Sequence, residues 1–154
     1  MRGGARRWRP ERALTLLREA LDLDSRNDLV LELLGHLAAR VAPRHDALAV
    51  FRHLLERYRW TGVSAPTALD RVACLLATTD PTAAATLFGA VDARGVLTSS
   101  MQRWIDERQR ATESIDASIG PDRRAEFYEH GAVMSVAQVT DEALDAVIRA
   151  LDDA

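Results

Sequence analysis

The residues of this chain that are best suited to bind a metal or to act as a nucleophile are four histidines and a single cysteine. The histidines are His36, His45, His53 and His130. Zinc sites need several ligands at short spacing, and none of these histidines lies in an H-E-x-x-H motif or near a pair of cysteines. His45 and His53 share a predicted helix, but they are eight residues apart, which is roughly 12 Å along its axis and too far for one ion. The sequence therefore predicts no metal and no other cofactor.

A search for catalytic groups gives a similar result. Cys74 lies in the apolar run 72–77, where a thiol behaves as a small hydrophobic side chain. No serine lies in a G-x-S-x-G motif. The chain contains no lysine, so it has neither a phosphate-loop lysine nor a Schiff-base lysine. Because the carboxylates are scattered over predicted helix surfaces, we expect the protein not to be an enzyme.

Helices must position all of these residues, since apolar side chains recur at helical spacing and no segment has the alternation of a strand. Capping signals at Ser25, at Asp80-Pro81 and at Ser135-x-x-Gln138 mark three helix starts. An apolar side of the longest helix contains Met101, Trp104, Ile105, Ala111 and Ile115. The predicted helices cover about residues 11–23, 26–41, 44–59, 69–76, 81–94, 99–118, 122–131 and 136–151.

Two stretches repeat each other at a spacing of 34 residues. Ala13, Leu14, Leu17, Ala20 and Leu21 reappear as Ala47, Leu48, Phe51, Leu54 and Leu55. Between them runs Leu31-x2-Leu34-Gly35-x2-Ala38. A third unit follows, in which Leu69-x2-Val72-Ala73-x2-Leu76 and Ala84-x3-Phe88 echo the same two helices.

This pattern resembles the tetratricopeptide repeat, whose period is 34 residues. The resemblance implies an all-α fold of antiparallel helix pairs stacked as a right-handed array, with small residues such as Gly35 where two helices approach most closely. We expect a flexible basic arm at residues 1–9 and a single helical repeat-like domain over residues 10–154. An ordinary helical bundle with a coincidental spacing is the alternative.

The second half of the chain carries another resemblance. The stretches AATLFGA at 84–90 and RWIDERQR at 103–110, with scattered residues from 119 to 144, are similar to the C-terminal region of large bacterial ATP-dependent transcriptional regulators of the LuxR and antibiotic-regulator types. The resemblance implies a helical sensing or interaction segment. Neither a nucleotide-binding P-loop nor a DNA-binding helix-turn-helix is present. The chain is thus expected to be a fragment of a longer reading frame or a stand-alone adaptor.

The expected partner is a protein or peptide on the concave face of the array, which the first helix of each pair would line. Glu32, His36 and Arg40 follow one another at four-residue spacing on that helix, and Asp70 occupies the place in the third unit that matches Glu32. These four residues are the predicted partner-binding site. The alternative is a solvated face with ordinary ion pairs along the helix.

Arg108 continues the apolar side of its helix, so we expect it to be partly buried in a structural ion pair.

The arginine-rich arm suggests a different function. Arg2, Arg6, Arg7 and Arg9 surround Trp8 and could neutralise phosphates while the indole stacks on a base. A small nucleic-acid-binding protein is therefore the alternative function. The net charge of −3 and the pI of about 5.8 argue against it, and we expect no nucleic-acid partner.

Composition also bears on location. The most apolar stretch, residues 83–91, is far shorter than the ~20 residues of a membrane-spanning helix. The basic start of the chain lacks the apolar segment of a secretory signal, and a lone cysteine cannot form a disulfide within the chain. We expect a cytoplasmic protein with no membrane partner.

Overall fold

Eight helices account for most of the described residues in the computed structural model, which describes residues 9–24, 26–63, 65–95 and 102–153. No strand occurs in these ranges, and the predicted all-α class is confirmed. The arginine arm, apart from Arg9, lies outside them. The helices are α1 (Pro10–Leu23), α2 (Asp28–Val41), α3 (Arg44–Thr61), α4 (Pro66–Leu76), α5 (Pro81–Ala93), α6 (Gln102–Ile119), α7 (Pro121–Ala132) and α8 (Val136–Asp152).

Local signals in the sequence set several of these helix ends. The Asp80 carboxylate accepts a hydrogen bond from the backbone N–H of Ala83, and it caps α5 as predicted. Ser135 and Gln138 form the predicted capping box of α8. The cap of α2 is Asn27, whose side chain accepts from the N–H of Val30. The predicted cap Ser25 is therefore wrong, since α2 begins at Asp28 and not near residue 26; Ser25 itself lies outside the described residues.

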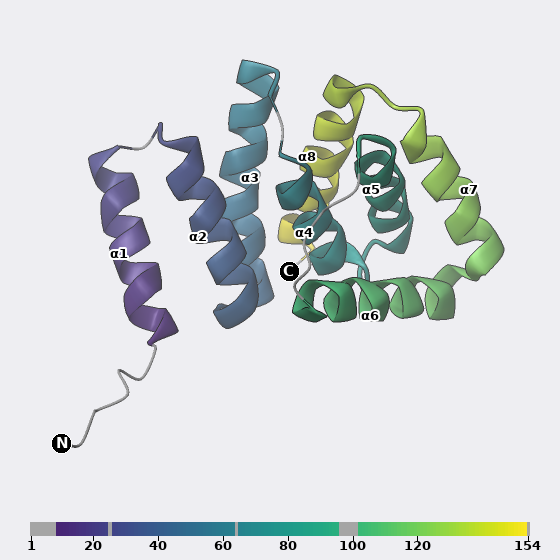
Figure 1. Ribbon diagram of the computed structural model, residues 1–154, viewed down its shortest axis with the longest axis horizontal. Helices are drawn as coiled ribbons and strands as arrows, with labels where there is room; N and C mark the ends of the chain where they lie inside the picture. The colour runs from purple at the N-terminus through teal and green to yellow at the C-terminus, as the bar shows by residue number, and fades with distance from the viewer. Residues whose placement is uncertain (1–8, 25, 64, 96–101, 154) are drawn as a thin grey trace.

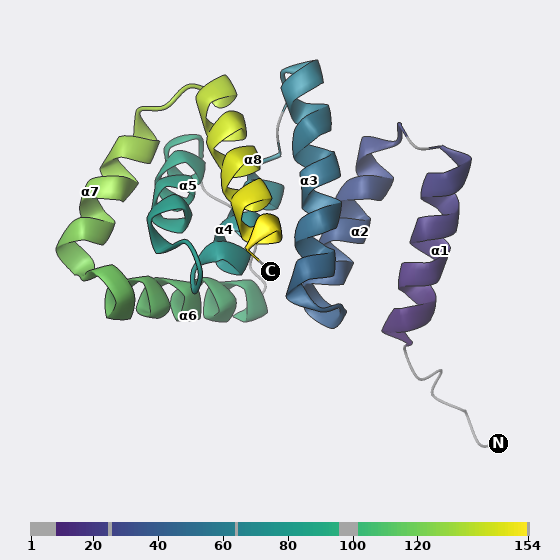
Figure 2. The same ribbon diagram turned by 180° about the vertical axis from the view of Figure 1, so that it is seen from behind.

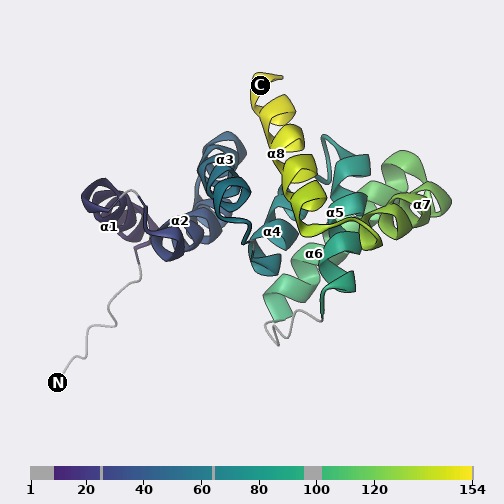
Figure 3. The ribbon, with the colours of Figure 1, turned by 90° about the horizontal axis from the view of Figure 1, so that it is seen from above.

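The first five helices run up and down in sequence order, and neighbours in the chain are neighbours in space (Figure 1). Seen from behind, α8 lies against the layer that α3, α4 and α5 form (Figure 2). The view from above places α6 on the opposite side of α4 from α8, with α7 beyond α5 (Figure 3). The core lies between α8 and this layer, where Val139, Ala143 and Val147 are buried against the α3–α5 side chains.

The predicted close approach at Gly35 is confirmed. A Cβ added to Gly35 would lie 2.9 Å from the ring of Phe51 on α3, which is closer than van der Waals contact. Phe51 is itself fully buried, so its ring has little room to move. A residue without a side chain is what allows α2 and α3 to pack at this point.

We expect replacement of Gly35 by leucine to destabilise the fold by about 1–3 kcal/mol, because the added atoms overpack the contact with Phe51. Alanine should cost less, since it adds one carbon atom beside the ring whereas leucine adds four. Urea denaturation of the two variants beside wild type measures the difference. Equal stability of the leucine and alanine variants would contradict the contact.

A second and closer contact joins α5 to α7. A Cβ added to Gly89 would lie 1.9 Å from the carbonyl oxygen of Tyr128, and one added to Gly131 would lie 1.8 Å from that of Thr86. Each glycine therefore lies against the carbonyl of the residue three positions before the other glycine, as expected for two antiparallel helices. The obstacle is backbone, which cannot move without separating the helices.

The side of α6 that faces the core differs in part from the prediction. Ala111 and Ile115 are buried as expected, but Ile105 is 50% exposed, so its predicted inward position is wrong. The inward stripe follows Trp104, Arg108, Ala111 and Ile115, and Ile105 lies about 100° around the helix from Trp104. Met101, also predicted on this side, lies outside the described residues.

Among the described residues, every helix is too short or too polar to serve as a membrane-spanning segment.

Candidate functional site

Two of the four predicted partner-binding residues, Glu32 and His36, lie together on α2, and a third, Asp70, lies on the neighbouring helix α4. The Nε2 atom of His36 is 3.6 Å from the Glu32 carboxylate. On α4, the Thr67 hydroxyl donates a 3.0 Å hydrogen bond to the same carboxylate, and Asp70 follows one turn later. Arg40 is exposed further along α2, and no interaction within the described ranges connects it to the other three.

Helix α6 of the same chain packs against His36 on α2 and Arg71 on α4. The Trp104 ring stacks on His36 with ring centroids 5.6 Å apart and an angle of 23° between the rings. The guanidinium of Arg71 on α4 lies 5.1 Å from the centroid of the Trp104 ring and pairs with Glu107. The sequence spacing placed His36 and Asp70 on a binding face but gave no indication that α6 would contact them.

Arg108 forms the ion pair that its position on α6 predicts. Its guanidinium lies 2.8 Å from the Asp92 carboxylate of α5 and 3.5 Å from the Asp70 carboxylate of α4. It also lies over the ring of Phe88, 4.6 Å from the centroid. A single arginine therefore connects three helices, and its expected partial burial and acidic partners are confirmed.

Burial controls the protonation of two groups in this region. It lowers the pKa of His36, and the nearby Arg71 lowers it further while Glu32 opposes the shift. His36 is therefore neutral at pH 7. Burial raises the pKa of Asp70, which is only 5% exposed, while Arg108 and Arg71 favour its charged form. One Asp70 oxygen has no hydrogen-bond donor among the described residues, so its stability as an anion depends on these arginines.

The single thiol is poorly suited to nucleophilic chemistry. Burial raises the pKa of Cys74 to about 12, so the reactive thiolate is essentially absent at neutral pH. Among the described residues no group of three or more His, Cys, Asp or Glu side chains is arranged to hold a metal ion.

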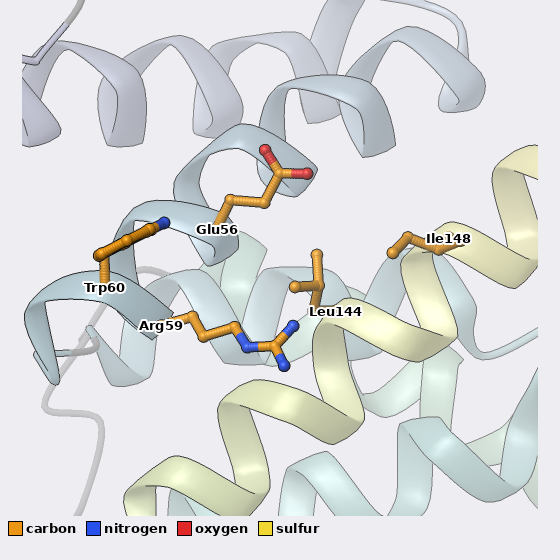
Figure 4. A pocket seen from close by; sticks show the side chains of 5 residues that line it. All are labelled: Glu56, Arg59, Trp60, Leu144 and Ile148. Carbon is orange, nitrogen blue, oxygen red and sulfur yellow. The ribbon is translucent and has the colours of Figure 1, made fainter.

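A different surface offers open space. A cavity of about 510 Å³ lies between α3 and α8, lined by Glu56, Arg59, Trp60, Leu144 and Ile148 (Figure 4). Trp60 is 88% exposed at the last turn of α3. Arg59 pairs with Asp141 of α8 at 3.3 Å, which holds the two helices together beside the cavity.

A second cavity, of about 560 Å³, shares two lining residues with the first, namely Glu56 and Trp60. Its apolar lining includes Leu21 of α1 and Leu31 of α2. We call the two cavities together the Trp60 groove, because this indole belongs to both. An exposed indole beside two cavities is a typical anchor for a protein partner, since tryptophan contributes a large contact area and one N–H donor.

Sequence reasoning did not identify the Trp60 groove, although one signal pointed to it. Phe51, Leu54 and Tyr58 follow the apolar stripe of α3, and Trp60 falls outside that stripe. A large aromatic residue off the apolar side of an amphipathic helix is expected to face solvent. The wall formed by Leu144 and Ile148 could not be foreseen, because nothing local in the sequence indicates that α8 packs on α3.

No family model, curated protein or solved structure matches this chain.

Proposed function

We propose that the protein is a non-catalytic interaction or regulatory segment with tetratricopeptide-like helix pairs, which binds a peptide segment of a protein partner in the Trp60 groove. The exposed indole between two cavities is the observation that carries this proposal. Tryptophan is enriched among the residues that dominate binding energies at protein interfaces, and Trp60 lines two cavities in addition to being exposed.

The repeat proposal is supported by packing in the two units. Phe51 of the second unit and Phe88 of the third are both buried, as are Leu34 and Val72 at equivalent places in the first helices of the pairs.

We also propose, from the resemblance stated above, a relation to the sensing region of bacterial ATP-dependent regulators and a cytoplasmic location. A regulatory segment of that kind works by contact with another protein.

The lining of the groove indicates the chemistry of the ligand. Ile148 on one side and Leu21 on the other are partly exposed, and beside Trp60 they favour aliphatic or aromatic side chains of a peptide. Glu56, Arg57 and Arg59 add charged groups to the lining. Glu32, His36, Arg40 and Asp70 are retained as a proposed second contact surface. A partner there would meet Trp104 and Arg108, which already contact His36 and Asp70, so the open groove is the proposed principal site.

Selection of peptides from a random displayed library on the wild-type chain tests the proposal, followed by anisotropy titration of the selected peptides. We expect Trp60→Ala to weaken their binding at least about tenfold, the effect of losing an anchor residue. Val133→Ala is the control, because Val133 is 82% exposed and lines neither cavity of the groove, and it should leave the affinity unchanged.

Two results would contradict the proposal. Failure to select any peptide would argue against a peptide-binding function. Peptides that bind Trp60→Ala as tightly as wild type, but lose affinity to the Glu32→Ala, His36→Ala, Arg40→Ala triple variant, would move the site to the face of α2.

A further inference from the structure

The outer face of α1 is open at positions that are covered in its counterpart α3. In the 34-residue register, Ala13, Leu17 and Ala20 of α1 match three residues of α3 that are fully buried, namely Ala47, Phe51 and Leu54. The α1 residues are only partly buried, with Leu17 packed at its edge on the cluster that Leu14 forms with α2. The adjacent Leu16 is 55% exposed. The difference arises because α3 packs on α2 through this face, whereas the equivalent place beside α1 is vacant among the described residues (Figure 1).

The residues of this open face are arranged symmetrically along the helix. Ala13 and Ala20 are equally distant from the midpoint between Leu16 and Leu17. Because seven residues make nearly two helical turns, both alanines lie on the same side of α1. Two such helices placed antiparallel about this midpoint would set each Ala13 against Ala20 of the other, and each Leu16 against Leu17. The small alanines allow close approach, as Gly35 does between α2 and α3.

The charges at the two ends follow the same symmetry. Arg9 and Asp24 flank α1 at equal distances from the midpoint, and both are exposed. Neither has an ion-pair partner within the described part of the chain. In the antiparallel arrangement Arg9 of one copy faces Asp24 of the other at both ends, whereas a parallel arrangement would place like charges together.

We propose that α1 pairs antiparallel with α1 of a second copy, forming a two-fold symmetric dimer. The contact is isologous, so every favourable pair occurs twice. Its area is that of two short helices, at the small end for protein interfaces, and the dimer therefore dissociates in an accessible range of concentration. The dimer contact uses neither Trp60 nor the α8 residues of the Trp60 groove, although Leu21 of α1 lines the second cavity of that groove.

Sedimentation equilibrium of the full chain from roughly 1 μM to 1 mM, a range that covers weak specific association, tests the proposal. We expect concentration-dependent dimerisation of the wild type. Leu16→Glu should raise the dissociation constant at least about tenfold, because it places a carboxylate at the centre of the contact. Leu29→Glu is the matched control, since Leu29 is 64% exposed and belongs to α2 instead of α1, and it should have no effect.

A charge exchange tests the antiparallel geometry separately. Arg9→Asp and Asp24→Arg should each weaken the dimer by roughly threefold or more, because each places like charges opposite one another twice. The double variant should regain wild-type association. A monomeric wild type throughout the range would overturn the proposal. So would failure of the double variant to recover while its circular dichroism spectrum remains that of wild type.

Discussion

Replacing Gly131 with alanine is expected to destabilise the fold by about 3 kcal/mol or more, which is at the upper end for overpacking. A Cβ at this position would lie 1.8 Å from the carbonyl oxygen of Thr86, so α5 and α7 must move apart. Gly89→Ala should act the same way through Tyr128. Alanine normally stabilises a helix relative to glycine by about 1 kcal/mol, so the predicted loss opposes the intrinsic preference. Urea denaturation measures it.

His130→Ala is the control for this substitution, because His130 is exposed and precedes Gly131 on the same helix. We expect a change of less than about 0.5 kcal/mol there, as is usual for surface positions. If Gly131→Ala were as stable as wild type, α5 and α7 would have to be further apart than described.

Arg108→Ala is expected to destabilise the fold by about 3 kcal/mol at pH 7, because it leaves the buried Asp70 carboxylate without its main positive partner. The loss should diminish as the pH falls from 7 into the acidic range in which Asp70 takes up a proton. Burial already raises the pKa of Asp70 and Arg108 opposes that shift, so removing Arg108 raises the pKa further. A folded-state pKa above the unfolded value means that proton uptake stabilises the folded variant at lower pH.

Two further variants identify the cause. Combining Arg108→Ala with Asp70→Asn should recover part of the loss, since the amide carries no charge to leave unpaired. Arg149→Ala removes an exposed pair with Asp80 and should cost less than about 1 kcal/mol. If the stability deficit of Arg108→Ala stays constant from pH 7 down to the pH at which the wild type begins to unfold, the Asp70 charge is not its cause. Lost packing on Phe88 or the lost pair with Asp92 would then account for it.

Helix positions were predictable from the sequence because their signals are local. Apolar spacing located the eight helices, and Asp80 and Ser135 fixed two starts to the residue. The arrangement of α6, α7 and α8 was not predictable. Gly89 and Gly131 are 42 residues apart in sequence, and neither has a local pattern that indicates a crossing partner.

In the candidate sites, too, local features were predictable and contacts between distant helices were not. The four-residue spacing of Glu32 and His36 placed both on one side of α2, where the structure has them in contact. Arg108 was expected to need an acid, but its sequence context could not select Asp70 and Asp92 from the many carboxylates of the chain. The Trp60 groove requires side chains from α3 and α8, and such a cavity exists only after distant helices have packed.

The position of α8 affects when the protein can fold during synthesis. Its residues Val139, Ala143 and Val147 complete a core whose other side comes from α3, α4 and α5. A ribosome makes these helices long before residues 136–152 emerge, so the apolar surface between α3 and α5 has no cover during that interval. Local pairing of α2 with α3 can form early, whereas closure of the core depends on a contact between segments far apart in the chain. Full stability is therefore reached only after translation of α8.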